Sequence, residues 1–337
     1  MAATIKDISA KTDLSISTIS KYINGGTVRP KNKLAIEQAI HEFDFHVNEY
    51  ARGLRTNKTK TIGVIIPLIH MEFSIQIISH AETILRQSGY GVIVCNFSGN
   101  EDAEQQIIDF LINKNVDGII AFPAPHSSKN RLSTSISKDV PIIYFNSKPN
   151  NLPYDCVMID NMNAVKDATS YLIDKGHTSI GIVNGPVDNT IVQERMMGYL
   201  NAFYEKGLHV DDRFYINGDL SVEASYRAVK DALTSGMDIT ALLATNYEMS
   251  VGTTIAIKEL GIKIPDDMSV IGFDDLQIMQ IIQPKMTLVT QPMKEMAEII
   301  ADLTLKRLSG TAPDNPQIVR LKAGFSEGDS VKDISNL

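Results

Sequence analysis

The chain has 337 residues, of which 43% are hydrophobic and 21% charged, a composition typical of a soluble protein with two or three folded domains. Its apolar runs are shorter than the ~18 residues that a membrane-spanning helix needs. Its polar N-terminus lacks the apolar core of a signal peptide, so we expect a cytoplasmic protein without membrane contact. The two cysteines, Cys95 and Cys156, lie in separate strand-like runs, which predicts buried reduced thiols and neither a metal site nor a cofactor.

Charge is unevenly distributed along the chain. The net charge is −8, yet residues 1–60 contain ten Lys and Arg against six Asp and Glu. A basic N-terminal segment on an acidic body is expected of a nucleic-acid-binding unit attached to a domain with another role. A surplus of this size is also common on an ordinary solvated surface, so the charge pattern needs support from the predicted elements.

Residues 4–23 contain the signals of two short helices. Thr4 can cap the first, with Asp7 in its first turn, and Ser15 can cap the second. Two short helices separated by about four residues form a helix-turn-helix arrangement. The second helix fits the DNA major groove because its outward side chains are short or cationic, although a solvated helix in a small bundle has the same pattern. These outward side chains are Ser17, Thr18, Ser20 and Lys21.

A third helix begins near Pro30, a residue that favours the first helical turn. The apolar spacing of the second and third helices predicts that their buried side chains are Ile16, Ile19, Ile23, Leu34, Ile36, Ile40 and Phe43.

Residues 48–56 have the pattern of a further, very short helix with an asparagine cap, and the polar linker 57–60 follows it. Gly53 weakens this helix by up to ~1 kcal/mol relative to alanine. A helix this short is marginal alone in water, so we expect it to be ordered only when it packs against something.

After residue 60, fully apolar runs alternate with amphipathic stretches. This alternation is typical of parallel sheets covered by helices on both faces, and its repetition predicts two α/β lobes. Ligands in such lobes bind beyond the carboxyl ends of the strands, so we expect a cleft where the lobes face each other. The predicted strands are 62–67, 91–97, 118–123, 141–146, 157–160, 180–184, 213–217, 241–245 and 269–273. The predicted helices are 73–88, 101–114, 161–175, 190–206, 222–235 and 247–260.

Polar residues collect at the ends of the predicted strands. Each of them alone could be a helix cap or a loop hydrogen bond. Together they suit a polyhydroxylated ligand, because carboxylates and amides bond to hydroxyls and a guanidinium adds a fork of donors. They are Asn146, Asp160, Asn246, Asp274 and Asp275, with Arg195 early in the helix after strand 180–184.

From residue 4 to about 324 the sequence resembles the LacI/GalR family of bacterial transcription regulators. The opening TIKDISAKTDLSISTISKYING and the segment YARGLRTNKTKTIGVIIP resemble the family's headpiece, hinge and first body strand. Further motifs recur in the family's order: VDGII (116–120), DNMNA (160–164), KGH (175–177), ERMMGY (194–199), SVIGFDD (269–275) and LVTQPMKEMA (288–297).

The resemblance implies an all-α helix-turn-helix headpiece joined to a two-lobed α/β body with the fold of periplasmic sugar-binding proteins. We expect the headpiece at 1–47, a hinge helix and linker at 48–60, and the effector-binding and dimerisation domain at 61–337. Within that domain we expect lobe one at about 61–160 and 292–320 and lobe two at about 161–291 and 321–337.

The resemblance also implies partners and site residues. The partners are double-stranded, pseudo-palindromic operator DNA, a small carbohydrate-like effector, and a second copy of the chain. Leu54 matches the hinge leucine that wedges into the minor groove, although it could also be an ordinary linker residue. The residues assigned to DNA are Thr4, Ser15, Ile16, Ser17, Thr18, Lys21, Asn24, Arg29, Asn48, Ala51 and Leu54. Those assigned to the effector are Phe73, Asn146, Asp160, Arg195, Leu220, Asn246 and Asp274.

Several positions depart from the family's usual pattern. Lys21 replaces an arginine, which weakens the case for two-pronged guanine recognition, and Asp13 replaces a turn glycine. The segment 72–74 places a carboxylate near the cleft, Tyr247 replaces an aspartate, and Leu220 stands where several members have an aromatic ring. These changes surround the predicted ligand and leave its identity open.

Three other functions compete with a sugar-controlled repressor. An enzyme is disfavoured, because the sequence has no GxSxG, HExxH, P-loop or GxGxxG pattern and no visible pair of nucleophile and base. A sugar-binding protein without DNA function conflicts with the N-terminal helices. A regulator controlled by a protein co-ligand stays open, as does the choice between inducer and corepressor.

Overall fold

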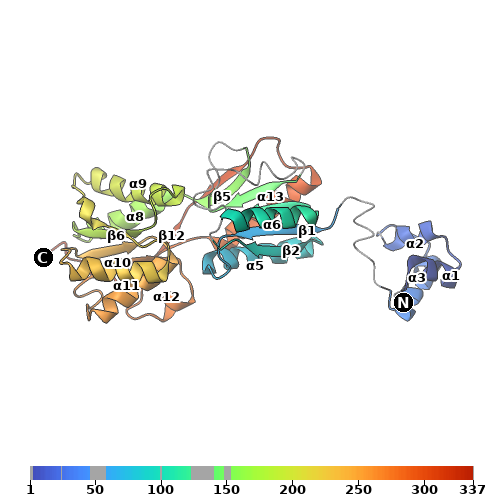
Figure 1. Ribbon diagram of the computed structural model, residues 1–337, viewed down its shortest axis with the longest axis horizontal. Coiled ribbons are helices and arrows are strands. Elements are labelled where there is room, and N and C mark those ends of the chain that lie inside the picture. Colours follow the sequence, from blue (N-terminus) through green and yellow to red (C-terminus); the bar gives the residue numbers. More distant parts are fainter. Residues whose placement is uncertain are drawn as a thin grey trace. The chain divides into compact units, whose positions relative to one another are not determined.

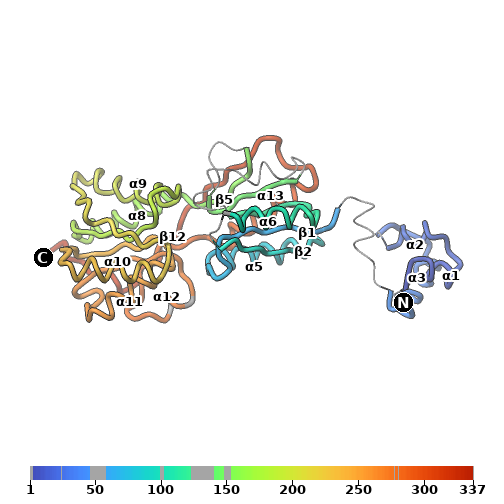
Figure 2. The backbone as a smooth tube through the Cα atoms, in the orientation of Figure 1, coloured from blue at the N-terminus to red at the C-terminus, as the bar shows by residue number. Residues whose placement is uncertain are grey.

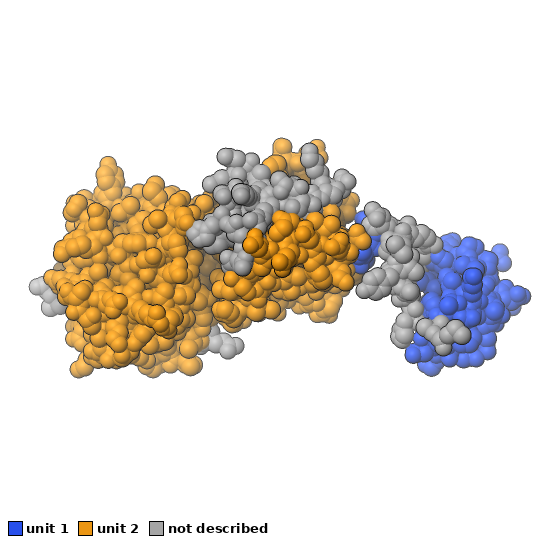
Figure 3. All heavy atoms as spheres, in the orientation of Figure 1, with its two compact units in different colours: residues 1–60 blue, residues 61–337 orange. Residues whose placement is uncertain are grey.

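The computed structural model describes residues 3–23, 25–45, 58–98, 101–122, 140–147 and 153–336. They belong to two compact units, residues 1–60 and 61–337, which Figure 3 shows in blue and orange. Four residues predicted to contact DNA lie outside the described residues; they are Asn24, Asn48, Ala51 and Leu54.

The described part of the first unit contains three helices, α1 (Ile5–Thr12), α2 (Ile16–Ile23) and α3 (Pro30–Glu42). Ile8, Ile19 and Ile36, one from each helix, are fully buried together and form its core. The backbone N–H and the hydroxyl of Thr4 both donate to Asp7 Oδ2 at 2.7 Å, which fixes the start of α1. Asp13 ends α1 with a φ of 51°, so it adopts the left-handed conformation that glycine takes up most easily.

Two predicted core residues of this unit are exposed instead. Ile16 is 45% exposed, because it opens an eight-residue helix and lies at the margin of a core centred on Ile19. Leu34 is 59% exposed. It is two residues from the buried Ile36, and 200° of rotation places it on the opposite side of α3.

The second unit contains two six-stranded sheets, each flanked by helices (Figure 1). We call them lobe one and lobe two. The strand order in lobe one is β11-β5-β4-β3-β1-β2, with β1 Thr61–Ile66, β2 Gly91–Asn96, β3 Gly118–Ala121, β4 Ile142–Phe145, β5 Asp155–Ile159 and β11 Ile318–Leu321. The order in lobe two is β12-β10-β9-β8-β6-β7, with β6 Ile180–Asn184, β7 Tyr215–Asn217, β8 Ala241–Ala244, β9 Ser269–Phe273, β10 Thr287–Thr290 and β12 Gly324–Ser326.

All described strand pairs are parallel except β10 with β12, which is antiparallel. This confirms the predicted two-lobed α/β body. The helices of lobe one are α5 Glu72–Gln87, α6 Glu101–Asn113 and α13 Met293–Ser309. Those of lobe two are α8 Asn161–Asp174, α9 Thr190–Glu205, α10 Val222–Thr234, α11 Tyr247–Glu259 and α12 Gln277–Ile281, with a single 3-10 turn at Asp212–Phe214.

The chain crosses between the lobes three times: from β5 to α8, from β10 to α13, and from β11 to β12 (Figure 2). The carboxyl ends of β5, β10 and β11 therefore lie at the junction. Since β5 and β10 run parallel to their neighbours in each sheet, the carboxyl edges of both sheets face the junction, where ligands of such folds bind.

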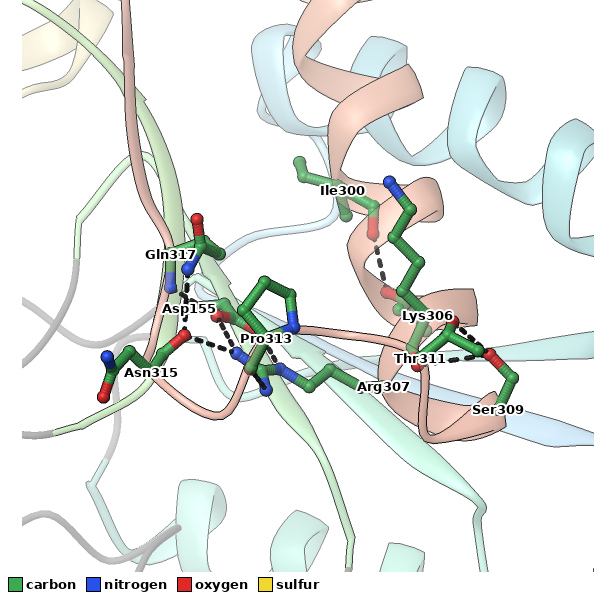
Figure 4. Close-up of polar contacts among 10 residues, drawn as sticks. Asp155, Ile300, Lys306, Arg307, Ser309, Thr311, Pro313, Asn315 and Gln317 are labelled. Atoms are coloured by element: carbon green, nitrogen blue, oxygen red, sulfur yellow. Dashed lines mark hydrogen bonds and ion pairs between the residues drawn. The ribbon is translucent and has the colours of Figure 1, made fainter.

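Arg307, near the end of α13, ties together the strands that lead into two of these crossovers (Figure 4). Its Nε and Nη2 donate to the two carboxylate oxygens of Asp155, the first residue of β5, at 2.7 and 2.8 Å. The backbone N–H of Gln317 donates to the same carboxylate at 2.7 Å. Arg307 also donates to the carbonyls of Pro313 and Asn315, so the segment before β11 is held against β5.

Cys156 is buried in β5 and Cys95 is half-buried in β2, and both are free thiols. Among the described residues, no helix is long and apolar enough to span a bilayer. Nor do the described residues contain a group of three His, Cys, Asp or Glu side chains that could hold a metal ion.

Candidate ligand cleft and DNA-contact helix

Helix α2 presents short polar side chains to solvent. Ser15, Ser17 and Lys21 are exposed, and Thr18 is half-buried. Ser15 Oγ accepts from the backbone N–H of Thr18 at 3.3 Å, as a capping residue should, and also lies 2.8 Å from Ser17 Oγ. The stem of Lys21 passes over Gly26, where a Cβ atom would lie 2.7 Å from Lys21 Cγ. The predicted contacts Thr4, Ile16 and Arg29 are exposed as well.

At the junction edge of lobe one lie two of the predicted effector residues. Phe73, in the first turn of α5, is buried. Asn146 follows β4 with a φ of 65° and is 8% exposed, and its Oδ1 has no hydrogen-bond partner in the described part of the chain. The next residue, Ser147, places its hydroxyl 3.2 Å from that of Thr190 on α9. Asn146 therefore stands where lobe one meets lobe two.

Arg195, in the second turn of α9, is the central cation of lobe two's junction edge and is 4% exposed. Its Nε donates to Asn161 Oδ1 at 2.9 Å, and its Nη1 donates to the carbonyl of Thr245. The guanidinium carbon lies 4.3 Å from the centroid of the Phe273 ring, within cation–π range. Burial lowers the pKa of Arg195 to about 10, which leaves it charged at neutral pH.

Asp274 follows β9 directly, is buried, and has a φ of 68°. Gln291 Nε2, from the second crossover, donates to its Oδ1 at 2.8 Å. Burial raises the pKa of Asp274 to about 7, although the hydrogen bond from Gln291 and the charge of Arg195 both act to lower it. This carboxyl group can therefore exchange a proton near neutral pH, as is common at ligand sites.

Asp160 and Asn246, two further predicted effector residues, cap helices. Asp160 begins α8, and its Oδ1 accepts from the backbone N–H of Asn163 at 3.1 Å. Asn246 begins α11, and its Oδ1 accepts from the backbone N–H of Met249 at 2.8 Å. Both side-chain oxygens are therefore engaged within the protein, as the capping alternative anticipated.

Leu220 has a left-handed backbone conformation, and its carbonyl takes part in a hydrogen bond. It has a φ of 55° and is half-buried, and its carbonyl accepts from Asn246 Nδ2 at 3.4 Å. Its side chain covers Gly185, where a Cβ atom would lie 2.6 Å from Leu220 Cδ2, so this close approach requires glycine. Leu220 thus contributes an apolar contact to the region around α11.

Sequence reasoning missed five residues that complete this arrangement. Asn161, Thr245 and Phe273 surround Arg195, Gln291 bonds to Asp274, and Glu248 accepts from Asn246 Nδ2 at 2.8 Å. Asn161, Thr245, Phe273 and Gln291 lie within two residues of a strand end or crossover, and Glu248 lies in the first turn of α11; these positions were the signal available. Which partner each would take depends on contacts between segments distant in the chain.

An ion pair joins the two lobes beside Arg195. Arg320 of β11 donates through Nη2 and Nη1 to the two oxygens of Glu194 on α9, at 2.7 and 3.0 Å. This two-pronged geometry is the stronger kind of ion pair. Because Glu194 directly precedes Arg195, the pair links the position of lobe one to the residue at the centre of lobe two's junction edge.

A groove of about 1000 Å³ lies along the crossover 290–292 between α5 and the start of α13. It contains Gln291 but none of the seven predicted effector residues. It is lined by Gln76, His80, Asp275, Leu276, Thr290, Gln291, Pro292, Met293, Lys294, Glu295, Glu298 and Ser326. We therefore place the candidate ligand site around Arg195 and Asp274, not in this groove.

We expect Asp274→Asn to change how stability depends on pH. A carboxyl group whose folded-state pKa is raised stabilises the fold fully below its unfolded pKa of ~3.9 and loses that contribution as pH rises through the folded value of about 7. The stability of the parent protein relative to the asparagine variant should therefore fall between pH 5 and pH 8. Urea midpoints at each pH measure this difference. The exposed Asp302→Asn on α13 is the control, and a pH-independent difference for Asp274→Asn would contradict the expectation.

A described three-helix unit with an exposed polar helix, followed by a two-lobed body crossed three times by the chain, defines a ligand-responsive DNA-binding regulator. Residues 59–322 match the family model for the periplasmic binding proteins and sugar-binding domain of the LacI family. The chain is 30% identical to catabolite control protein A of Priestia megaterium, over 95% of this chain and 97% of the relative. The chain belongs to the LacI family of transcription regulators.

Other relatives agree with this assignment. The transcriptional repressor CytR of Escherichia coli K12 is 30% identical over 92% of this chain and 91% of its own length. Among solved structures, the lac repressor dimer bound to operator and an anti-inducer matches with a TM-score of 0.88 and 20% identity, over 98% of this chain and 100% of that one. That structure supports the fold, and the curated relatives are transcription regulators rather than enzymes.

Proposed function

We propose that the protein is a cytoplasmic repressor whose operator affinity is controlled by a small polyhydroxylated effector, a sugar or sugar derivative, held between the lobes. The observation that carries this proposal is the group around Arg195. A buried guanidinium, fixed by Asn161 and Thr245, stands at the junction edge of lobe two, and an unpartnered buried amide oxygen, Asn146 Oδ1, stands at that of lobe one. Facing donors and acceptors of this kind suit a ligand rich in hydroxyls.

The DNA-contacting residues are proposed to be the exposed positions of α1, α2 and the start of α3 together with the segment 48–56. Support comes from the exposure of Ser15, Ile16, Ser17 and Lys21. Short side chains let the backbone of a helix approach the floor of the major groove, where base edges carry distinct patterns of donors and acceptors. Arg29, the N-cap residue of α3, is proposed to contact phosphate.

The protein is proposed to act as a homodimer on a pseudo-palindromic operator. Strand β2 forms an edge of the lobe-one sheet and is only partly covered. In lobe two, three isoleucines of the α11 and α12 region, Ile255, Ile278 and Ile281, are exposed, the last of them by 76%. Exposed apolar residues of this kind are expected where a second copy of the chain packs.

Lys21→Ala is expected to weaken operator binding about 5- to 150-fold, because loss of a good base contact costs ~1–3 kcal/mol. It should also relax the preference at one base position. The operator is first obtained by selecting binding sites from a random DNA library with the parent protein, and affinities are then measured by fluorescence anisotropy at fixed salt.

Lys33→Ala on α3 is the matched control, since Lys33 faces Glu37 one turn away on the same helix and is exposed. It should lower affinity for all DNA sequences alike through lost electrostatic attraction. An unchanged selected site and unchanged affinity for Lys21→Ala would remove Lys21 from base recognition. Failure of the parent protein to select any site would refute the proposed function.

A further inference from the structure

Two buried hydrogen-bond acceptors beside the candidate cleft lack a donor among the described residues. Asn146 Oδ1 in lobe one and Gln291 Oε1 in the second crossover are both buried without a partner. A buried acceptor without a donor costs roughly 1–3 kcal/mol. Both oxygens lie beside the junction, since Asn146 precedes the Ser147–Thr190 contact and Gln291 bonds to Asp274. These acceptors indicate a ligand that donates.

The charges around the cleft are also unbalanced. Asp274 and Glu248 belong to lobe two, and burial raises the pKa of each carboxyl group above its ordinary value. Glu72, in the first turn of α5 in lobe one, lies close enough to raise the pKa of Glu248 and of Tyr247 further. The charge of a lobe-one carboxylate therefore acts on a lobe-two carboxyl group across the junction. Among the described residues, Arg195 is the one cation whose charge acts on Asp274 and Glu248.

Arg195 is partly committed to the protein, because two of its five N–H groups take part in the hydrogen bonds found among the described residues. Its Nε donates to Asn161, its Nη1 donates to the carbonyl of Thr245, and one face of its guanidinium lies against the Phe273 ring. The neighbouring Glu194 forms an ion pair with Arg320. A ligand phosphate entering this site would meet the carboxyl groups of Glu72, Glu248 and Asp274 and a single guanidinium. An anionic effector is therefore the least suited to it.

We propose, on the basis of the function proposed above, that the effector carries a protonated amine: an amino sugar or a comparable polyhydroxylated amine. Its ammonium group lies between Glu72 and Glu248, and its hydroxyls donate to Asn146 Oδ1 and Gln291 Oε1. An ammonium has three donors and no acceptor, which matches a site with buried acceptors that lack a donor. Its charge also compensates carboxylates that burial otherwise disfavours. Glu72 and Glu248 are then the residues that determine specificity.

Matched sets of probes test this inference on the full-length protein. Each set contains a neutral hexose, its 2-amino-2-deoxy counterpart and its 6-phosphate, in the glucose, galactose and mannose series. Affinities are measured by isothermal titration calorimetry and confirmed by the shift in melting temperature. In at least one series we expect the amine to bind at least tenfold tighter than the neutral sugar, and the phosphate to bind weakest.

Proton release provides a second readout. Binding of a cation should lower the pKa of Asp274 and Glu248. Asp274 is influenced by Arg195 of α9 and by Glu248 and the Tyr247 backbone of α11, and Glu248 by Arg195 and by Glu72 of α5. Protons are then released near pH 7, and the measured binding enthalpy changes with the ionisation enthalpy of the buffer. A neutral sugar bound to the same site should release fewer protons.

Variants assign the preference to particular side chains. Glu72→Gln and Glu248→Gln keep the size of each side chain and remove its charge, so each should reduce the preference for amine over neutral sugar about tenfold. Glu82→Gln is the matched control, since Glu82 lies on α5 beyond the cleft and pairs with Arg86; it should leave that preference unchanged.

The outcomes separate this inference from the function on which it rests. If a neutral hexose or its phosphate binds as tightly as the amine in every series, the inference is wrong while sugar control stands. Amine preference that survives both Glu→Gln variants also overturns it. If no probe binds or alters operator affinity, the proposed control by a sugar-like effector fails and the inference fails with it.

Discussion

Replacement of Arg195 by alanine should abolish the response of operator binding to effector and lower effector affinity by about 10- to 150-fold. A hydrogen bond to a charged group contributes about 1.5–3 kcal/mol, and this guanidinium also fixes Asn161 and the end of β8 through Thr245. Effector affinity by calorimetry and operator affinity with and without effector measure the result. Arg195→Lys retains the charge but loses the fork of donors, so it should recover only part of the affinity.

The Arg195→Ala protein should still fold, because Asp274 can respond by taking up a proton. The charge of Arg195 lowers the pKa of Asp274, so without it that pKa rises further above about 7 and the carboxyl group becomes neutral. The loss of stability is then limited to the hydrogen bonds of Arg195, and it should be larger at pH 8 than at pH 6. Urea unfolding at both values tests this.

Arg213→Ala is the matched control, since Arg213 is 82% exposed and pairs only with Asp211 two residues away among the described contacts. It should leave effector affinity and unfolding midpoint within experimental error of the parent. Full effector affinity in Arg195→Ala would mean that the ligand site lies elsewhere, with the groove along 290–292 as the next place to examine.

The regular elements were largely predictable from local signals. Strands 180–184 and 269–273 have the predicted bounds, and α9 differs by one residue, because fully apolar runs between amphipathic stretches have few alternative structures. Asp13 adopts a left-handed φ, as its place in the helix-turn-helix turn suggested. The elements after residue 273 were not predicted: α12, β10, α13, β11 and β12. Strand β12 had the weakest signal, since Gly324–Ser326 is short and pairs antiparallel with β10, far from it in the chain.

The positions of the candidate site residues were predictable from the sequence, but their hydrogen-bond partners were not. The pattern of polar residues at strand ends pointed to Asn146, Arg195 and Asp274, and all three lie at the junction edges of the two lobes. It could not distinguish Asp160 and Asn246, whose oxygens cap helices, from residues free to meet a ligand. Nor could it pair Arg195 with Thr245, 50 residues away, because this contact depends on how distant segments of lobe two pack together.

The arrangement of the two lobes depends on the strands that lead into the crossovers. Asp155 begins β5, which leads into the first crossover, and Gln317 precedes β11, which leads into the third and carries Arg320. Arg307 binds the carboxylate of Asp155, and the same carboxylate accepts from the backbone N–H of Gln317 (Figure 4). The role of Arg307 therefore extends from the stability of lobe one to the relative placement of the crossovers.

Arg307→Met is expected to lower the free energy of unfolding by about 3–5 kcal/mol, because removing one partner of a buried ion pair leaves the other uncompensated. Asp155 is only 2% exposed in its side chain, and the carbonyls of Pro313 and Asn315 also lose a donor. Urea denaturation measures the change. Arg227→Ala on α10 is the matched control: its pair with Glu223 is exposed on both sides, and such pairs contribute about 0–1 kcal/mol.

The double variant Asp155→Leu with Arg307→Met separates the cost of a lone buried charge from the value of the pair. Well-packed apolar replacements of a buried ion pair are often neutral, so the double variant should recover at least half of the stability lost in Arg307→Met. Effector affinity should stay reduced in both proteins, since neither restores the link from α13 to the segment before β11. Recovery of stability together with full effector affinity would show that Arg307 serves the fold of lobe one alone, and that the crossovers are positioned by contacts nearer the cleft, such as Arg320 with Glu194.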